Sequence, residues 1–327
     1  MHSFSELSKI FEEKFNVRHF PHEPGSLYNA SQYILSIGGK RIRPVMCLMG
    51  NELFNEINPD SFYVATAVEL FHNFSLIHDD IMDKAPLRRG FQTVHSKFGE
   101  STALLSGDVM LVMAYEYINK IRIEYLHKVI SIFNKAAREV CEGQQMDMDF
   151  AQMDAVREKE NLQIDEYIKM IELKTSVLLA ASLQLGAVLG GAGLGNQQHL
   201  YEFGKNLGIA FQVQDDYLDA FGDPEKFGKQ VGGDILANKK TFLLIHALEV
   251  ATAAQLKELK NLSHVDADGK VEKILQIYND CNVNEWAKEL KMKYLKQALH
   301  HLEEIAVLSL RKKQLKELAE YLIEREH

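Results

Sequence analysis

The sequence predicts an all-α fold, and three observations point to it. Its six prolines lie at positions 21, 24, 44, 59, 86 and 224, so the interval from Leu87 to Asp223 has none. Apolar residues in that interval recur mostly with the period of a helix. Alternating β-branched runs bounded by Asn-Gly or Asp-Gly turns are missing apart from Asp268-Gly269 in a polar segment. We expect a single domain over residues 1–327, because no linker or low-complexity tract interrupts the chain.

Composition and cysteine usage indicate a large soluble protein of the cytoplasm. The chain is 46% apolar and 25% charged, which is ordinary for a globular domain. Its three cysteines, Cys47, Cys141 and Cys281, are odd in number and widely spaced, as expected of reduced thiols in the cytosol. The N-terminus carries early acids and no apolar core, so we expect no targeting peptide.

The first motif along the chain is a basic segment with two glycines, GGKRIRP at 38–44. Glycines let the backbone approach a ligand closely, and three cations follow within four residues. Taken alone, the segment is compatible with a phosphate-binding turn or with an ordinary solvated loop.

An aspartate cluster, DDIMD at 79–83, then lies in an apolar helical stretch. Residues four apart share a helix face, so Asp79 and Asp83 direct two carboxylates the same way. Pro86 is expected to end this helix and to place Arg88 and Arg89 on a turn. Guanidinium groups in that position can hold phosphate oxygens bidentately.

The segment from Thr175 to Gln198 has no charged residue and approaches the length of a membrane span. Ser182, Gln184 and a Gly-Gly-Ala-Gly tail dilute its apolar character. We therefore predict a buried central helix that does not span a membrane, with small residues that allow close packing.

A second cluster, DDYLD at 215–219, repeats the design of the first within the apolar stretch 211–221, and Lys229, Lys239 and Lys240 follow it. A lone cluster of this kind is commonly a helix cap or a solvated face, but apolar flanks argue against that here. Buried like charges repel and need a counter-charge. Mg²⁺ takes one or two carboxylates, water and the oxygens of a substrate phosphate. Two clusters therefore indicate two faces that grip one diphosphate.

Together these motifs resemble the polyprenyl (isoprenyl) diphosphate synthases, the head-to-tail prenyltransferases. Seven segments match that family's successive blocks in order: GGKRIRP at 38–44, ELFHNFSLIHDDIMDKAPLRRG at 69–90, SGDVML at 106–111, EGQQMD at 142–147, LKTS at 173–176, FQVQDDYLD at 211–219 and GKQVGGDILANKKT at 228–241. The resemblance implies an isoprenoid-synthase-type helical bundle around a deep central cavity, and a homodimer.

The resemblance also implies roles for individual residues. Asp79, Asp83 and Asp215 would hold three Mg²⁺ ions on the allylic diphosphate (dimethylallyl, geranyl or farnesyl), supported by Asp80, Asp216 and Asp219. Further contacts to that diphosphate would come from Arg88, Lys174, Lys229 and Lys239. Isopentenyl diphosphate would bind without metal through Lys40, Arg43, His72 and Arg89. Backbone carbonyls near Lys174 and Thr175, and the side chain of Gln212, would face an allylic cation.

The formal charge of −9 is consistent with an anionic substrate, because six of the acids lie in the two clusters and require cations. A basic stripe with interleaved aromatics is missing, so we expect no nucleic-acid partner.

Product length is expected to depend on the helix below the first cluster. One turn before Asp79 is Ser75, which is small, and two turns before it is Phe71, roughly 12 Å deep by helix rise. Phe74 flanks that path. This pattern resembles geranylgeranyl-forming (C20) members more than farnesyl-forming (C15) ones, which remain the alternative, because a facing helix around Met110, Met113 and Ala114 can also form the floor.

Three other classes of protein are less consistent with the sequence. A terpene cyclase would not need GGKRIRP, Arg89 or a second DDxxD motif. A non-catalytic synthase subunit typically has eroded aspartates, whereas both clusters are intact. A di-iron bundle would need Glu-x-x-His ligands, which the clusters lack.

Overall fold

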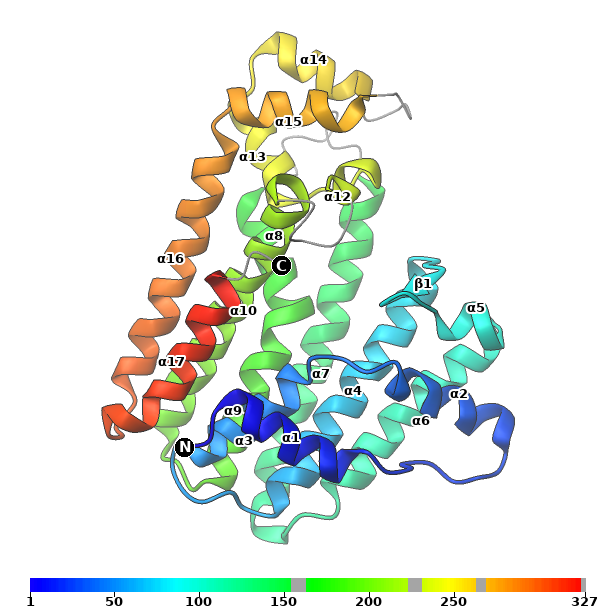
Figure 1. Cartoon of the computed structure of the whole chain (residues 1–327), viewed down its shortest axis with the longest axis vertical. Coiled ribbons are helices and arrows are strands. Elements are labelled where there is room, and N and C mark those ends of the chain that lie inside the picture. The colour runs from blue at the N-terminus through cyan, green and yellow to red at the C-terminus, as the bar shows by residue number, and fades with distance from the viewer. Residues whose placement is uncertain (154–162, 223–230, 263–268, 325–327) are drawn as a thin grey trace. The chain divides into compact units, whose positions relative to one another are not determined.

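The computed structural model describes residues 1–153, 163–222, 231–262 and 269–324 (Figure 1). Lys229 lies outside the described residues. Helices account for nearly all of the regular structure, together with one short two-stranded hairpin, so the all-α prediction is confirmed. The chain divides into two compact units. Unit 1 comprises 1–137, 178–201 and 305–314, and unit 2 comprises the described residues of 138–177, 202–304 and 315–327. The expectation of a single domain stays a prediction.

Unit 1 contains the N-terminal helices, the hairpin and parts of four further helices. Its elements are α1 (Phe4–Phe15), α2 (Gly25–Ser36), α3 (Ile42–Glu52), α4 (Asp60–Met82), β1 (Leu87–Arg88), β2 (Phe91–Gln92), α5 (Val94–Phe98), α6 (Glu100–Ile118), the first half of α7 (Ile123–Gln152), most of α9 (Val177–Leu189) and the starts of α10 (Leu194–Phe221) and α17 (Ser309–Glu324).

Helix α4 is the core helix of unit 1. The residues from Val64 to Phe71 are all buried, which explains why this 23-residue helix has little amphipathic character. The helix ends at Met82 with Asp83 as its C-cap, and Lys84 follows with a left-handed φ of 52°. The chain therefore leaves the helix before Pro86, consistent with the exclusion of the α conformation ahead of a proline.

The apolar helix α9 is buried, as predicted, and packs against α3 through small residues. A Cβ atom at Gly186 would overlap the carbonyl oxygen of Cys47, and one at Gly50 would overlap that of Leu183. By length and composition the helical stretch Ile164–Leu189 could cross a membrane, but 78% of its most apolar window is buried within the protein. Its apolar side chains thus serve the core.

Unit 2 surrounds a second apolar core. Its elements are the second half of α7, α8 (Ile164–Ile171), a π-helical turn (Glu172–Ser176), most of α10, α12 (Gly233–Leu236), α13 (Phe242–Val250), α14 (Ala253–Leu262), α15 (Lys270–Asp280), α16 (Val283–Glu304) and most of α17. Phe242 and Tyr278 lie in this core. The ring of Trp286 stacks on His246 with centroids 3.9 Å apart, which joins α16 to α13.

We predict that Gly186→Ala destabilises the protein by about 1–3 kcal/mol, the usual cost of overpacking. The added methyl group would force α9 away from α3, so the thermal midpoint should fall. Gly195→Ala is the matched control, because a Cβ atom at Gly195 meets no atom within 4 Å and the position lies in α10. Equal midpoints for the two variants would contradict the close packing.

Candidate active site

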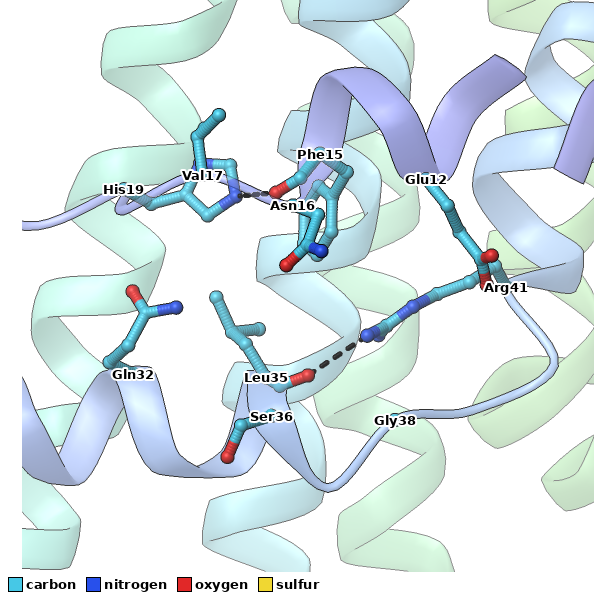
Figure 2. A pocket seen from close by; sticks show the side chains of 10 residues that line it. All are labelled: Glu12, Phe15, Asn16, Val17, His19, Gln32, Leu35, Ser36, Gly38 and Arg41. Carbon is cyan, nitrogen blue, oxygen red and sulfur yellow. Dashed lines mark hydrogen bonds between the residues drawn. The ribbon is translucent and has the colours of Figure 1, made fainter. Parts of the chain in front are cut away.

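The glycine-rich segment is fastened to unit 1 by Arg41. This residue is the N-cap of α3 in the left-handed conformation, with φ 49°. Its guanidinium donates to Oε1 of Glu69 at 2.5 Å. It also donates to the carbonyl oxygen of Leu35 at 2.9 Å, as Figure 2 shows. Asn73 donates to the same Glu69 oxygen at 3.0 Å. All three side chains of this polar cluster are buried, so Arg41 is a structural element of the segment.

A cavity of about 320 Å³ lies beside Arg41, and Figure 2 shows the side chains that line it. It is formed by the end of α1, by α2 and by the backbone at Gly38. None of the site residues predicted from the sequence lines it.

Arg43 and His72 form the centre of a cationic group. Nη1 of Arg43 lies 3.2 Å from Nε2 of His72, a geometry that assigns Nε2 as the acceptor. Burial, reinforced by the neighbouring charges of Arg43 and Arg89, lowers the pKa of His72 well below its usual value. Burial also lowers the pKa of Arg43 to about 10. Nε of Arg43 is buried without a hydrogen-bond partner among the described residues, so this group is short of negative charge.

The hairpin brings Arg89 to the same place. Arg89 and Gly90 both have positive φ, 53° and 81°, and β1 and β2 pair around them as in a type I′ turn. Arg89 donates to the carbonyl oxygen of Gly38. A Cβ atom at Gly39 would lie 2.7 Å from the guanidinium, so a side chain there would displace Arg89 from this position. The prediction of a turn carrying the arginine pair is confirmed.

Arg88 neutralises part of the first aspartate motif. Its Nε lies 2.9 Å from both carboxylate oxygens of Asp80, and its Nη2 lies 3.2 Å from Oδ2 of Asp79. Asp80 is buried, and Asp83 lies one turn after Asp79, with its N–H bonded to the Asp79 carbonyl oxygen at 2.9 Å. The glycine-rich segment, the hairpin with its two arginines and the first aspartate motif therefore lie next to one another within unit 1.

In unit 2, Asp216 is the most enclosed carboxylate of the second motif. It accepts hydrogen bonds from Tyr167 of α8 and, at 2.9 Å, from Gln212 one turn earlier on α10. Burial raises the pKa of Asp216 to about 7, and the charges of Asp234 and Asp215 add to that effect against the two hydrogen bonds. Gln212 and Asp216 thus belong to one hydrogen-bonded group.

Asp219 is held by the loop around α12. Its Oδ2 accepts the backbone N–H of Asp234 at 2.8 Å, and its carbonyl oxygen accepts that of Gly232 at 2.6 Å. Nζ of Lys239 lies 2.7 Å from Oδ1 of Asp234. Burial raises the pKa of Asp219 as well.

Lys174 lies on the π-helical turn Glu172–Ser176, between α7 and α10 of unit 2. Its Nζ lies 2.6 Å from Oδ2 of Asp147. A Cβ atom at Gly143 would overlap the backbone of Lys174, and one at Gly208 would lie 2.7 Å from Cβ of Ser176. Such a turn interrupts the regular hydrogen-bond ladder, and π-turns are frequent at functional sites.

Divalent cations fit the donors of both motifs. Burial and the charge of Asp234 raise the pKa values of Asp216 and Asp219, and a bound cation would favour their ionised form. Among the residues described, no three His, Cys, Asp or Glu side chains are grouped as a complete metal cage. Mg²⁺ needs only one or two carboxylates when phosphate and water complete its shell. The donor set therefore suits an ion that binds together with a diphosphate.

The residues predicted to set product length lie in the apolar interior of unit 1. Phe71 and Phe74 are buried with ring centroids 5.4 Å apart, and Phe71 also meets Phe133 of α7 edge-on at 5.4 Å. Ser75 is half-buried and donates to the carbonyl oxygen of His72 at 2.8 Å. Of the facing residues on α6, Met110 and Ala114 are fully buried.

Four residues were given no role from the sequence: Asp147, Tyr167 and Asp234, which contact predicted site residues, and Glu69, which contacts Arg41. Three of them stand inside the quoted blocks, and Glu69 is an acid within an apolar helix. A charge in such a place signals a buried partner. Tyr167 gave no comparable signal.

Comparison with known proteins identifies the family. The model of the polyprenyl synthetase family matches residues 24–281, so this chain belongs to that family. A geranylgeranyl pyrophosphate synthase of Geoglobus acetivorans is 37% identical over 98% of both chains. A short chain isoprenyl diphosphate synthase of Methanocaldococcus jannaschii is 42% identical over 77% of this chain and 75% of its own. A crystal structure of a geranylgeranyl pyrophosphate synthase, 40% identical, superposes with a TM-score of 0.92 over the whole of both chains.

We predict that Glu69→Ala destabilises the protein by about 3–5 kcal/mol, because it leaves the Arg41 guanidinium buried without its counter-charge. Urea unfolding measures the change, and Glu69→Ala combined with Arg41→Met should recover part of it. The control is Arg138→Met, which removes an exposed ion pair with Glu142 and should cost less than about 1 kcal/mol. Similar losses for Glu69→Ala and the control would show that the Arg41–Glu69 pair does not hold the segment.

Proposed function

We propose that this protein is a Mg²⁺-dependent head-to-tail prenyltransferase that condenses isopentenyl diphosphate with an allylic diphosphate to give geranylgeranyl diphosphate. The observation that carries the proposal is the cationic group of Arg43, His72 and Arg89 beside the Asp79–Asp80 motif in unit 1. The cationic group suits a diphosphate bound by protein side chains alone, and the aspartate motif suits a diphosphate bound through metal ions. A reaction between two diphosphates requires both.

In this proposal isopentenyl diphosphate binds to Lys40, Arg43, His72 and Arg89. Its phosphates would supply the negative charge that the Arg43 environment is short of. Because the His72 ring is neutral, it adds a hydrogen-bonding group without adding to the repulsion among the arginines.

In this proposal both aspartate motifs serve the allylic diphosphate. Asp79, Asp83 and Asp215 would hold Mg²⁺, with Asp80, Asp216 and Asp219 in support. The ions held there would supply Lewis-acid assistance to the departure of the diphosphate from C1. Arg88, Lys174, Lys229 and Lys239 add positive charge to the same group.

The remaining chemistry needs no protein nucleophile. The isopentenyl double bond attacks the allylic cation, a new C–C bond forms, and a proton passes to an oxygen of the released diphosphate. Carbonyls of the π-turn at Lys174 and Thr175, and the side-chain oxygen of Gln212, would face the cation. The apolar surroundings of both motifs keep water from quenching it.

The C20 product rests on two relatives named above as geranylgeranyl pyrophosphate synthases and on the pattern of Ser75 with Phe71 and Phe74. A C15 product is the alternative. We propose further that the enzyme acts as a homodimer in the cytoplasm.

We predict that Arg43→Gln and Asp83→Ala affect different substrates. Arg43→Gln should raise the KM for isopentenyl diphosphate by about 10–100-fold, as expected for the loss of a hydrogen bond to a charged group. Asp83→Ala should instead remove most of the turnover, because it deletes a metal ligand. The wild-type enzyme should need Mg²⁺ and lose activity in excess chelator.

Initial rates with each allylic primer in turn, and mass analysis of the products, make these measurements. Arg138→Gln, at an exposed position on α7, is the control for removal of an arginine. Full wild-type activity in excess chelator would refute the metal-dependent mechanism. A rise only in the allylic KM of Arg43→Gln would refute the assignment of the two diphosphates.

We predict that Phe74→Ala yields products longer than those of the wild type, because it shortens a side chain below the first motif. Phe71→Ala should do the same at a larger cost in stability, since Phe71 also packs on Phe133. Phe11→Ala removes an equally buried ring from α1 and should leave product length unchanged. If neither Phe71→Ala nor Phe74→Ala lengthens the product, these rings only pack the core.

A further inference from the structure

A lysine is buried at an unfavourable place in unit 2. Lys270 is 1% exposed and is the first residue of α15, directly after the N-cap Gly269. Burial of an ammonium group is costly, and the N-terminus of a helix disfavours a positive charge. A residue that breaks two local rules at once often serves a site.

The ammonium of Lys270 reaches the loop that follows α12. Its Nζ donates to Oδ1 of Asn238 at 2.9 Å. Asn238 has a left-handed φ of 54°, and its N–H bonds to the carbonyl oxygen of Ile235 at 3.1 Å. Asn238 therefore follows α12 in a left-handed conformation, and the hydrogen bond from Lys270 to the Asn238 side chain holds it there.

The same loop contacts α15 at a second point. A Cβ atom at Gly232 would lie 2.5 Å from Cγ1 of Val271, so the backbone there lies directly on α15. Figure 1 shows α12 beside α15 in unit 2. The segment from Gly232 to Lys239 is thus attached to α15 at both of its ends.

The other side of this segment meets the second aspartate motif. The backbone N–H groups of Gly232 and Asp234 bond to Asp219, and Lys239 pairs with the Asp234 carboxylate. The Lys239 N–H bonds to the carbonyl oxygen of Asp234 at 2.9 Å, so the residue next to Asn238 is tied to the group that holds Asp219. A displacement of Asn238 would therefore be transmitted to Asp219.

We propose that Lys270 is a positioning residue for the second aspartate motif. By fixing Asn238 it holds Asp234 and Lys239 in the orientation in which they support Asp219 and the metal-bound diphosphate. This inference rests on the proposed function, because it concerns the allylic half of that site. Lys270 itself touches neither substrate nor metal in this account.

The test compares Lys270→Met, which keeps the length and apolar stem of the side chain, with Lys273→Met on an exposed part of the same helix. Calorimetric titration with Mg²⁺ and inorganic pyrophosphate measures the metal-dependent half-site directly. Removal of a residue that orients a metal ligand typically costs about 10–100-fold in metal affinity or activity. We expect that loss in Lys270→Met, with a matching rise in the allylic KM and an unchanged KM for isopentenyl diphosphate. Lys273→Met should behave as wild type.

Asn238→Gly provides a second variant in case Lys270→Met folds poorly. Glycine adopts positive φ without strain, so this change removes the acceptor and keeps the turn. It should reproduce the loss in Lys270→Met, and the double variant should lose no more than either single one. Amide hydrogen exchange over residues 231–240 should quicken in both variants.

Unchanged pyrophosphate affinity and allylic KM in Lys270→Met and Asn238→Gly, even with a lower thermal midpoint, would reduce Lys270 to core packing. Lack of prenyl transfer by the wild-type enzyme with every primer would refute the proposed function instead. The exchange rates and pyrophosphate affinities remain measurable in that case, so the two failures are distinguishable.

Discussion

The constraint on which the rest of the structure depends is the compensation of buried charge. Asp80, Asp216 and Glu69 are carboxylates with almost no exposure, and each has a partner on another structural element. Arg88 reaches Asp80 from the hairpin, Tyr167 reaches Asp216 from α8, and Arg41 reaches Glu69 from the glycine-rich segment. Because an unpaired buried charge is so costly, these pairings fix where loops can lie.

The two units satisfy this constraint to different degrees. In unit 1 Arg88 contacts the acidic motif directly. Around Arg43 and His72 positive charge exceeds negative charge. In unit 2 burial, together with the charge of Asp234, raises the pKa values of Asp216 and Asp219. A surplus of cations suits an anionic ligand, and a surplus of carboxylates suits metal ions. The same physical rule thus produces two complementary kinds of site.

The features that could be predicted from the sequence are those that local sequence patterns determine. Proline spacing and helical periodicity predicted the all-α fold, and Pro86 predicted the turn that carries the arginine pair. Nothing in the sequence separates Arg41 from the other cations of its segment, because the direction of the Arg41 side chain depends on Glu69, which lies in another helix. The contacts of Asp147 and Asp234 could not be predicted for the same reason, since they depend on tertiary packing between helices. The π-turn at Lys174 has no signature in its residues and follows from the glycines at 143 and 208.

Three residues other than glycine adopt left-handed backbone in unit 1: Arg41 and Arg89, beside the cationic group, and Lys84, directly after the first aspartate motif. Such conformations carry a cost of order 1–3 kcal/mol each and persist only where the surroundings determine them. The loops at this place are therefore shaped when the chain folds and need not be ordered by a ligand. Less of the free energy of binding is then consumed in arranging the protein, and more remains to act on the reacting bond.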